Sequence, residues 1–307
     1  MRIRLAIASL VIVSALVPGE VRAQNDPRAA LLVSTDWLAK NLQNPKVVVL
    51  HAGDRRSYDA GHIPGARFVN LEELATSDHE TPGALMLQVP ELPKVRESLQ
   101  KLGISDDSKI VVYFNGDRFT PATRLILTLD HVGLGAQTSL LDGNLETWRD
   151  EKRETTTDAT PAKTGSLSPL RARGLIVDGD FVQSNIGRPG VSVVDGRAPV
   201  FYDGVQTGRG MHAPHKTGHI AGAKSIPYSS VTDTRNRLKS REELAAIFAK
   251  AGVKPGDTVV GYCHIGLQAT GMLFAARSLG HKVLLYDGSF EDWSARPGSL
   301  VETTAAK

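Results

Sequence analysis

The chain has 307 residues, with 36 lysines and arginines, 33 aspartates and glutamates, and one cysteine. This near balance of charge argues against nucleic acid or another polyanion as the main partner, and a single cysteine cannot form an internal disulfide. The length suits two domains of ordinary size, each large enough for its own hydrophobic core.

The first 23 residues have the pattern of a secretory signal peptide. Arg2 and Arg4 precede an apolar run over residues 5–17, which is too short to span a bilayer, and Ala23 is a small residue at the expected cleavage point. An uncleaved membrane anchor is the alternative. Removing this segment takes away three arginines and one glutamate and leaves 33 basic and 32 acidic side chains. We therefore expect cleavage after Ala23 and a periplasmic or secreted protein without stable membrane association.

Residues 31–150 are expected to form a first domain in which strands and helices alternate. Its apolar runs are almost continuous, which is typical of strands covered on both faces of a parallel sheet. Ser34 can cap the first helix. The predicted strands are 47–50, 110–114 and 137–141, and the predicted helices are 35–42, 92–102 and 121–129.

Residues 151–173 are rich in Thr, Ser, Lys, Pro and Ala without periodicity, so we expect a linker there. The same order of elements then returns in residues 174–300. The repeated segments are Gly-His-Ile-x-Gly-Ala at 61–66 and 218–223, and Asp-Gly-x-x-x-x-Trp at 142–148 and 287–293. This repetition predicts an α/β fold of two tandem domains, each a parallel sheet flanked by helices.

The only cysteine, Cys263, follows an apolar strand and precedes a helix that begins near Ala269 and ends before Gly280. In parallel sheets, ligands bind beyond the carboxyl ends of the strands. A turn there gathers unpaired backbone N–H groups, which favour an anion, and a thiol beside them is favoured as its reactive thiolate. The alternative is a buried, unreactive thiol. By count, Asn115 matches Cys263 in the first half, so only the second domain is expected to be catalytic.

Together, the two Gly-His-Ile loops, the Cys-x-x-Gly turn of the second half and the two Asp-Gly-x-x-x-x-Trp segments resemble the tandem-domain rhodanese family over residues 34–293. This resemblance implies a sulfurtransferase of the thiosulfate or 3-mercaptopyruvate type. The family's cysteine, here Cys263, accepts a sulfane sulfur from a small donor as a persulfide and passes it to cyanide or to a thiol, including a thiol on a protein. We expect no cofactor and no metal.

The resemblance also implies supporting residues around the cysteine. Asp195 and Arg197 match an Asp-x-Arg pair that fixes the loop by a charge-assisted contact. Positive charge for an anionic donor is expected from Arg197, Arg209 and, when protonated, His264. The expected donor-binding turn comprises His264, Ile265, Gly266, Leu267 and Gln268.

The sequence does not decide between thiosulfate and 3-mercaptopyruvate as the sulfur donor, because the turn differs from both types of family member. Thiosulfate-type members carry a basic residue where this chain has Ile265, and an arginine where it has Phe201. Mercaptopyruvate-type members have a small Gly-Ser pair where this chain has His264 and Ile265. The sequence therefore fits neither donor class.

Other interpretations are a noncatalytic sulfur-carrier or binding module, a Cdc25-like cysteine phosphatase, and a metal site. The phosphatase would need an arginine at the end of the turn, where Gln268 stands. A metal could use His212, His215 and His219, but His219 belongs to the repeated loop. We expect the loop histidines to tie their loops by hydrogen bonds, and the repeated tryptophans, Trp148 and Trp293, to pack in the core.

Overall fold

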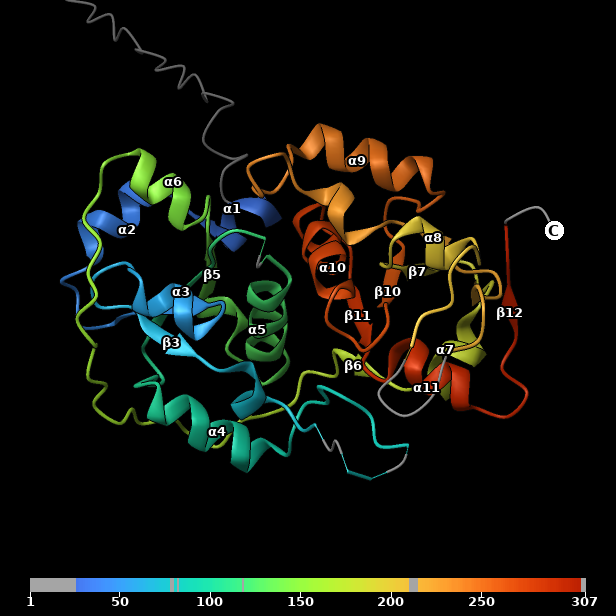
Figure 1. Ribbon diagram of the computed structural model, residues 1–307, viewed down its shortest axis with the longest axis horizontal. Coiled ribbons are helices and arrows are strands. Elements are labelled where there is room, and N and C mark those ends of the chain that lie inside the picture. The colour runs from blue at the N-terminus through green and yellow to red at the C-terminus, as the bar shows by residue number, and fades with distance from the viewer. Residues whose placement is uncertain (1–25, 78–79, 82, 118, 210–214, 305–307) are drawn as a thin grey trace, which may run out of the picture.

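The computed structural model describes residues 26–77, 80–81, 83–117, 119–209 and 215–304 (Figure 1). The signal peptide expected at residues 1–23 lies outside these ranges. Within the described part of the chain, no helix has the length and apolar character needed to cross a membrane.

The first domain is built on a five-stranded parallel sheet with the strand order β1-β5-β4-β2-β3. Its strands are β1 (Leu32–Val33), β2 (Val47–Ala52), β3 (Arg67–Val69), β4 (Lys109–Tyr113) and β5 (Thr138–Leu141). Its helices are α1 (Pro27–Leu31), α2 (Thr35–Asn41), α3 (Arg55–Asp59), α4 (Leu92–Lys101), α5 (Phe119–His131) and α6 (Leu145–Asp150), with 3-10 turns η2 (Leu71–Leu74) and η3 (Gly135–Gln137).

The second domain repeats this sheet in the equivalent order, β6-β11-β10-β7-β9. Its strands are β6 (Ile176–Val177), β7 (Val191–Asp195), β9 (Lys224–Ser225), β10 (Thr258–Tyr262) and β11 (Val283–Tyr286), with an antiparallel pair of β8 (His219–Ile220) and β12 (Val301–Glu302). Its helices are α7 (Gly179–Asn185), α8 (Pro199–Tyr202), α9 (Arg241–Lys250), α10 (Ala269–Ser278) and α11 (Ser289–Ala295), with the 3-10 turn η4 (Tyr228–Val231).

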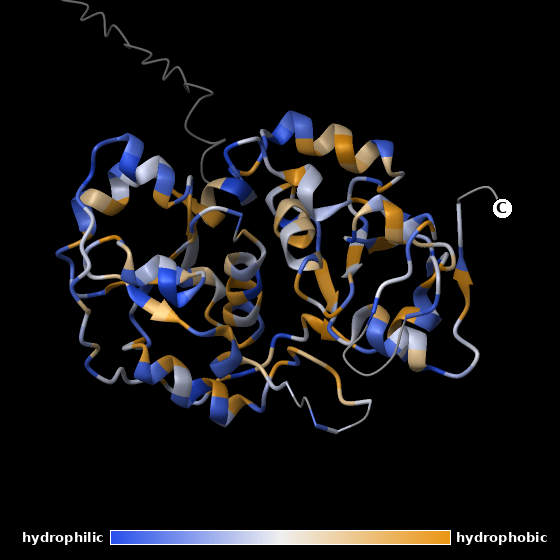
Figure 2. Ribbon diagram, viewed as in Figure 1, coloured by the Kyte–Doolittle hydropathy of each residue, from blue (hydrophilic) through white to orange (hydrophobic). Residues whose placement is uncertain are grey.

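Alternate residues of each central strand enter the cores on opposite faces of the sheet. In β4, Val112 packs with α4 and α5 on one face, while Val111 packs with α2 and α6 on the other. Hydrophobic residues accordingly gather on the strands and on the inner sides of the helices (Figure 2). The predicted α/β fold of two parallel sheets flanked by helices is confirmed, because strands covered on both faces must be apolar throughout.

The two domains meet along α5 and α10, which lie side by side in Figure 1. Phe119 and Phe274 pack edge to face with ring centroids 6.3 Å apart, and the hydroxyls of Thr123 and Thr270 are 2.9 Å apart. One continuous apolar cluster includes residues of both helices. The domains therefore share a core along the helix that follows Cys263.

The duplication extends to individual hydrogen bonds. The Tyr113 hydroxyl accepts from the Ile63 N–H at 3.2 Å, and the Tyr262 hydroxyl accepts from the Ile220 N–H at 3.1 Å. The strand registers agree, since Tyr113 and Tyr262 both end the strand at the middle of their sheets. Tyr113 is therefore the counterpart of Tyr262.

This register corrects the expected match between Asn115 and Cys263. The residue after Tyr113 is Phe114, and its carbonyl accepts from the Leu145 N–H at 2.9 Å. The carbonyl of Cys263 makes the same contact with the Phe290 N–H at 3.0 Å. Phe114 is thus the counterpart of Cys263, because the strand register rather than the polarity of the following loop sets the equivalence.

Both loop histidines tie their loops as expected. The Nδ1 of His62 lies 2.9 Å from the Tyr58 carbonyl, and the Nδ1 of His219 lies 2.7 Å from the Tyr202 carbonyl. However, Tyr58 and His62 are four positions apart, whereas Tyr202 and His219 are seventeen apart. The second domain therefore carries a longer segment, residues 203–218, which we call the insertion.

Residues 151–173 form no helix or strand, apart from one bridge between His62 and Thr156. The Arg96 Nε donates to the Leu167 carbonyl at 2.7 Å, and the Ser168 hydroxyl donates to Asp106 at 2.7 Å. This segment therefore runs along the first domain rather than standing free of it.

The repeated tryptophans pack in the core as expected. Trp148 is 2% exposed and Trp293 is fully buried. Each indole N–H donates to a backbone carbonyl, that of Glu154 and that of Leu300. Each tryptophan therefore fills an equivalent place in its own domain.

Candidate active site

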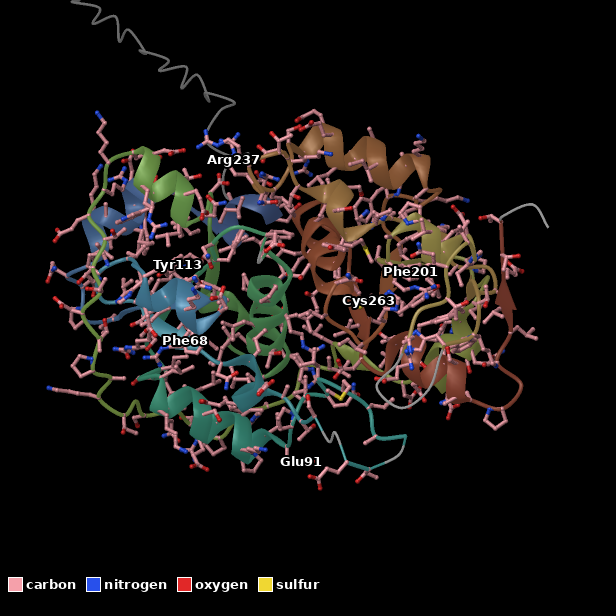
Figure 3. The ribbon with its side chains drawn as sticks, in the orientation of Figure 1. Phe68, Glu91, Tyr113, Phe201, Arg237 and Cys263 are labelled. Atoms are coloured by element: carbon pink, nitrogen blue, oxygen red, sulfur yellow. The ribbon has the colours of Figure 1, made fainter. Side chains whose placement is uncertain are left out.

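Cys263 lies at the carboxyl end of β10, between β7 and β11, and is fully buried (Figure 3). Its N–H donates to the hydroxyl of Ser289 at 3.2 Å. Ser289 has a φ of +53°, a conformation that costs free energy in a residue other than glycine. The residue after the strand is thus held by a strained turn at the start of α11.

In the loop of residues 264–268, four of the five carbonyl groups are bonded, whereas the N–H groups have no acceptor among the described residues. Four carbonyls accept hydrogen bonds, namely those of His264 from Glu291 N–H (3.0 Å), Gly266 from Arg124 Nη1 (3.0 Å), Leu267 from Thr270 N–H (3.2 Å) and Gln268 from Gly271 N–H (3.1 Å). Within the described residues, no N–H group from residue 264 to residue 268 donates to a protein acceptor. Free donors of this kind beside a helix N-terminus can hold an anion.

Asp195 and Arg197 form the expected charge-assisted contact inside the second domain. The Arg197 Nη2 lies 2.6 Å from Asp195 Oδ2 and also donates to the Gly218 carbonyl at 2.7 Å. Burial acts to lower the pKa of Arg197, but the hydrogen bonds and charge of Asp195, with smaller effects of Tyr262 and Cys263, raise it overall. Arg197 is therefore a permanent buried cation whose field reaches Cys263.

His264 is paired with a second imidazole, His215, from the insertion. The centroids of the two rings are 5.5 Å apart, with an angle of 26° between the ring planes. The Phe201 ring packs edge to face on the His264 ring, with centroids 4.7 Å apart. Both nitrogens of His215 and the Nδ1 of His264 are buried without a hydrogen-bond partner in the described residues. This pair therefore offers unused hydrogen-bonding groups on the residue that follows Cys263 and on the insertion.

The expected charge on His264 is not available at neutral pH. Burial, followed by the charges of Arg197 and His215, lowers the pKa of His264 to about 3. Burial and the charge of Arg197 lower the pKa of His215 to about 4. Both imidazoles are consequently neutral donors and acceptors, whereas Arg197 stays charged.

The other expected site residues divide between the loop and the insertion. Ile265, Leu267 and Gln268 are half-buried, and Arg209 is exposed. Gly208, beside Arg209, approaches so closely that a Cβ there would lie 2.7 Å from the His264 ring. His212 of the considered metal site lies outside the described residues.

From the sequence we expect the first domain to be a structural partner that closes the site, but the residues that make this contact were not among those predicted. Arg124 of α5 and Asp287 after β11 form a buried ion pair at 2.5 Å, and Arg124 also bonds the loop at Gly266. Asp287 opens a repeated motif, and Arg124 interrupts an apolar helix. Those two signals were present in the sequence, because a buried arginine in such a helix requires a partner.

Known proteins with this organisation confirm the family. The profile of the rhodanese-like domain matches residues 34–151 and again residues 179–296. The chain belongs to the rhodanese family. This rhodanese is 30% identical to the 3-mercaptopyruvate sulfurtransferase of Escherichia coli K12, over 88% of this chain and 97% of the relative.

Other relatives carry related names. The chain is 31% identical to the sulfur carrier protein TtuD of Thermus thermophilus, over 90% of this chain and 96% of the relative. It is 28% identical to the thiosulfate sulfurtransferase of Rattus norvegicus, over 86% of this chain and 92% of that protein. Such relatives support sulfur transfer between small-molecule donors and acceptors such as thiols.

Solved structures agree on the fold. The crystal structure of the 3-mercaptopyruvate sulfurtransferase SseA from Escherichia coli superposes with a TM-score of 0.73 and 26% identity, covering 84% of this chain and 98% of that one. The wild-type structure of EanB superposes with a TM-score of 0.79 and 21% identity, covering 92% of this chain and 71% of that one. At that lower identity, the second likeness concerns the fold alone.

Proposed function

We propose that this rhodanese transfers a sulfane sulfur from thiosulfate or 3-mercaptopyruvate to cyanide or a thiol through a persulfide on Cys263. The observation that carries this proposal is the loop 264–268, where four of the five carbonyls are bonded elsewhere and no N–H group donates to an acceptor in the described residues. A sulfur anion at Cys263 needs such donors, and no acceptor in the described part of the chain competes for them.

The transfer consists of two displacements at sulfur. First, the thiolate of Cys263 attacks the outer sulfur of thiosulfate, a new S–S bond forms, and sulfite leaves with the electron pair of the old bond. With 3-mercaptopyruvate, a C–S bond breaks instead and the carbon takes a proton to give pyruvate. Second, cyanide or a thiolate attacks the outer sulfur, and Cys263 leaves as the thiolate.

Arg197 and the imidazole pair would bind the donor in different ways. The buried charge of Arg197 favours an anion beside Cys263 without needing a proton from solution. His215 and His264 stay neutral and would donate hydrogen bonds to oxygens of the donor. Arg209, on the exposed side of the insertion, would attract anionic donors and acceptors from solution.

A sulfur carrier without efficient turnover is the second candidate, and one observation favours it. One relative is named a sulfur carrier protein. A carrier would take up sulfur once and deliver it to a thiol of a protein partner. Turnover with small acceptors therefore separates the two functions.

Intact mass spectrometry after incubation with thiosulfate or 3-mercaptopyruvate tests the proposal. We expect a gain of about one sulfur atom, reversed by a thiol and absent from Cys263→Ser. The same samples rank the two donors, and cyanide or dithiothreitol in excess shows whether turnover continues beyond one sulfur per protein. Equal sulfur gain in Cys263→Ser would disprove the mechanism.

Full burial is also a property of an unreactive cysteine, so the reactivity of the thiol needs its own measurement. We expect iodoacetamide to alkylate Cys263 in the native protein and thiosulfate to protect it. Alkylation seen only after unfolding would support the unreactive thiol.

We further propose export to a periplasm or beyond, which rests on residues 1–23 alone. The mass of the protein recovered from its producing cell should correspond to a chain that begins at Gln24. A chain that retains residues 1–23 would instead favour the membrane anchor.

A further inference from the structure

Arg124 connects the first domain to the catalytic loop of the second. It lies on α5, is 3% exposed, and bonds three acceptors through its two Nη atoms. Nη1 donates to Gly266 O at 3.0 Å and to Asp287 Oδ1 at 2.5 Å, and Nη2 donates to Leu87 O. Both domains thus contribute acceptors to one buried guanidinium.

Asp287 completes this contact from the second domain. Its Oδ2 accepts from the Val89 N–H at 3.1 Å, and its carbonyl accepts from the Gln88 side chain at 3.2 Å. Asp142 opens the same Asp-Gly motif in the first domain and is exposed. The buried position of Asp287 is therefore a property of the interface rather than of the motif.

The contact constrains the direction of a free N–H group in the loop. Gly266 has a φ of +77° and places its carbonyl against Arg124. In a planar trans peptide, the carbonyl of one residue and the N–H of the next point in opposite directions. Bonding the Gly266 carbonyl to Arg124 therefore directs the Leu267 N–H away from the interface.

We propose that Arg124 is a positioning residue of the sulfur-transfer reaction, by which the domain without a cysteine holds the N–H donors of the catalytic loop in place. This inference rests on the proposed function. It gives the first domain a role in catalysis through geometry, although Arg124 touches neither donor nor acceptor.

The test compares Arg124→Met with Arg277→Met in the full-length protein. Arg277 of α10 forms an ion pair of 2.9 Å with Asp130 of α5, so its loss also removes an ion pair between the two domains. Arg277 makes no hydrogen bond or ion pair with the loop 264–268 among the described residues. A double variant, Arg124→Met with Asp287→Asn, removes the guanidinium without leaving a buried carboxylate unpaired.

Single-turnover persulfide formation, followed by intact mass, provides the readout. At saturating thiosulfate, we expect the rate constant to fall about 10²-fold in Arg124→Met and in the double variant, and to stay within about twofold in Arg277→Met. Arg124→Lys should recover part of the rate, since an ammonium can reach one of the acceptors. A folding defect alone would lower the amplitude of the mass change and leave the rate constant of the folded fraction unchanged.

The possible results distinguish the positioning role of Arg124 from the proposed function on which it rests. A wild-type rate constant in the double variant would overturn the positioning role and leave the proposed function intact. An equal loss in Arg277→Met would assign the effect to the interface in general and would also overturn it. Failure of the wild-type protein to gain sulfur would overturn the proposed function and this inference together.

Discussion

The loop after β4 and the loop after β10 occupy equivalent places in the two domains, but their N–H groups are used differently. In the first domain, the Gly116 N–H donates to both oxygens of Glu146 at 3.2 Å. Phe114 replaces the thiol and packs against Phe119 with ring centroids 5.7 Å apart. The first domain has thus filled with its own side chains the place that the second domain leaves for sulfur.

The neighbouring strand shows the same contrast. The strand registers make His51 of β2 the counterpart of Asp195 of β7. Two residues later, Gly53 is the counterpart of Arg197. Burial, followed by the charge of His62, lowers the pKa of His51 to about 4. The first domain therefore has a neutral ring where the second has a buried ion pair, which shows that one fold can support either environment.

The most demanding test of this difference between the domains moves the thiol into the first domain. The double variant Phe114→Cys with Cys263→Ser should gain no sulfur from thiosulfate. In the first domain, Glu146 already accepts the hydrogen bond of the Gly116 N–H, and Gly53 has no charge in the place of Arg197. Intact mass gives the result, with the parent protein as the positive control. A sulfur gain at position 114 would show that the loop and the cation are unnecessary.

Removing the buried cation should produce the largest loss of stability. Arg197→Met leaves the Asp195 carboxylate buried and unpaired, so we expect the free energy of unfolding to fall by about 3–5 kcal/mol in a urea titration. Arg55→Met is the control in the first domain, because Arg55 pairs with Asp59 at the surface. Similar urea midpoints for the two variants would contradict the importance of the buried pair.

A glycine in each loop sharpens the comparison, Gly266 in the second domain and Gly116, the counterpart of Ile265, in the first. A Cβ on Gly266 would lie 2.8 Å from the Asp287 carbonyl oxygen, whereas a Cβ on Gly116 meets nothing within 4 Å. Gly266→Ala should therefore lower sulfur transfer by about 10²-fold, because a displaced loop misplaces its donors. Gly116→Ala should cost only the backbone strain of a positive φ, about 1 kcal/mol, with activity retained. Equal activities in the two variants would count against the loop geometry.

The smallest effect concerns acid stability. His51, His215 and His264 have folded-state pKa values of about 4, 4 and 3, below the value near 6.5 of an unfolded chain. Below about pH 6.5 the unfolded state binds more protons, so their stabilisation is complete above that pH and is lost as the pH falls toward 4. Urea titrations at pH 7 and pH 5 should show a smaller loss in His51→Asn than in the parent.

The low pKa values of His215 and His264 also predict how the rate of sulfur transfer depends on pH. Because His215 and His264 are already neutral at pH 5, the pH profile of sulfur transfer between pH 5 and 8 should contain no step that disappears in His264→Asn. A step that this substitution removes would mean that His264 titrates near neutrality and acts as a cation.

The sequence alone determined most of the architecture. Continuous apolar runs predicted the buried strands, and Ser34 predicted a helix cap, which the structure shows as its hydroxyl accepting from the Trp37 N–H at 3.1 Å. The position of Cys263 at the carboxyl end of a strand followed from the change of period between β10 and α10. These features are local, so neighbouring residues in the chain carry their signal.

Contacts between distant segments could be decided only by the tertiary structure. Counting along the chain matched Asn115 with Cys263, but the hydrogen-bond register of parallel strands placed Phe114 there. Arg124 and Asp287 are 163 positions apart, and nothing in either local pattern specifies the other. The neutral state of His264 likewise depends on Arg197 and His215, because burial and nearby charge arise only once the chain has folded.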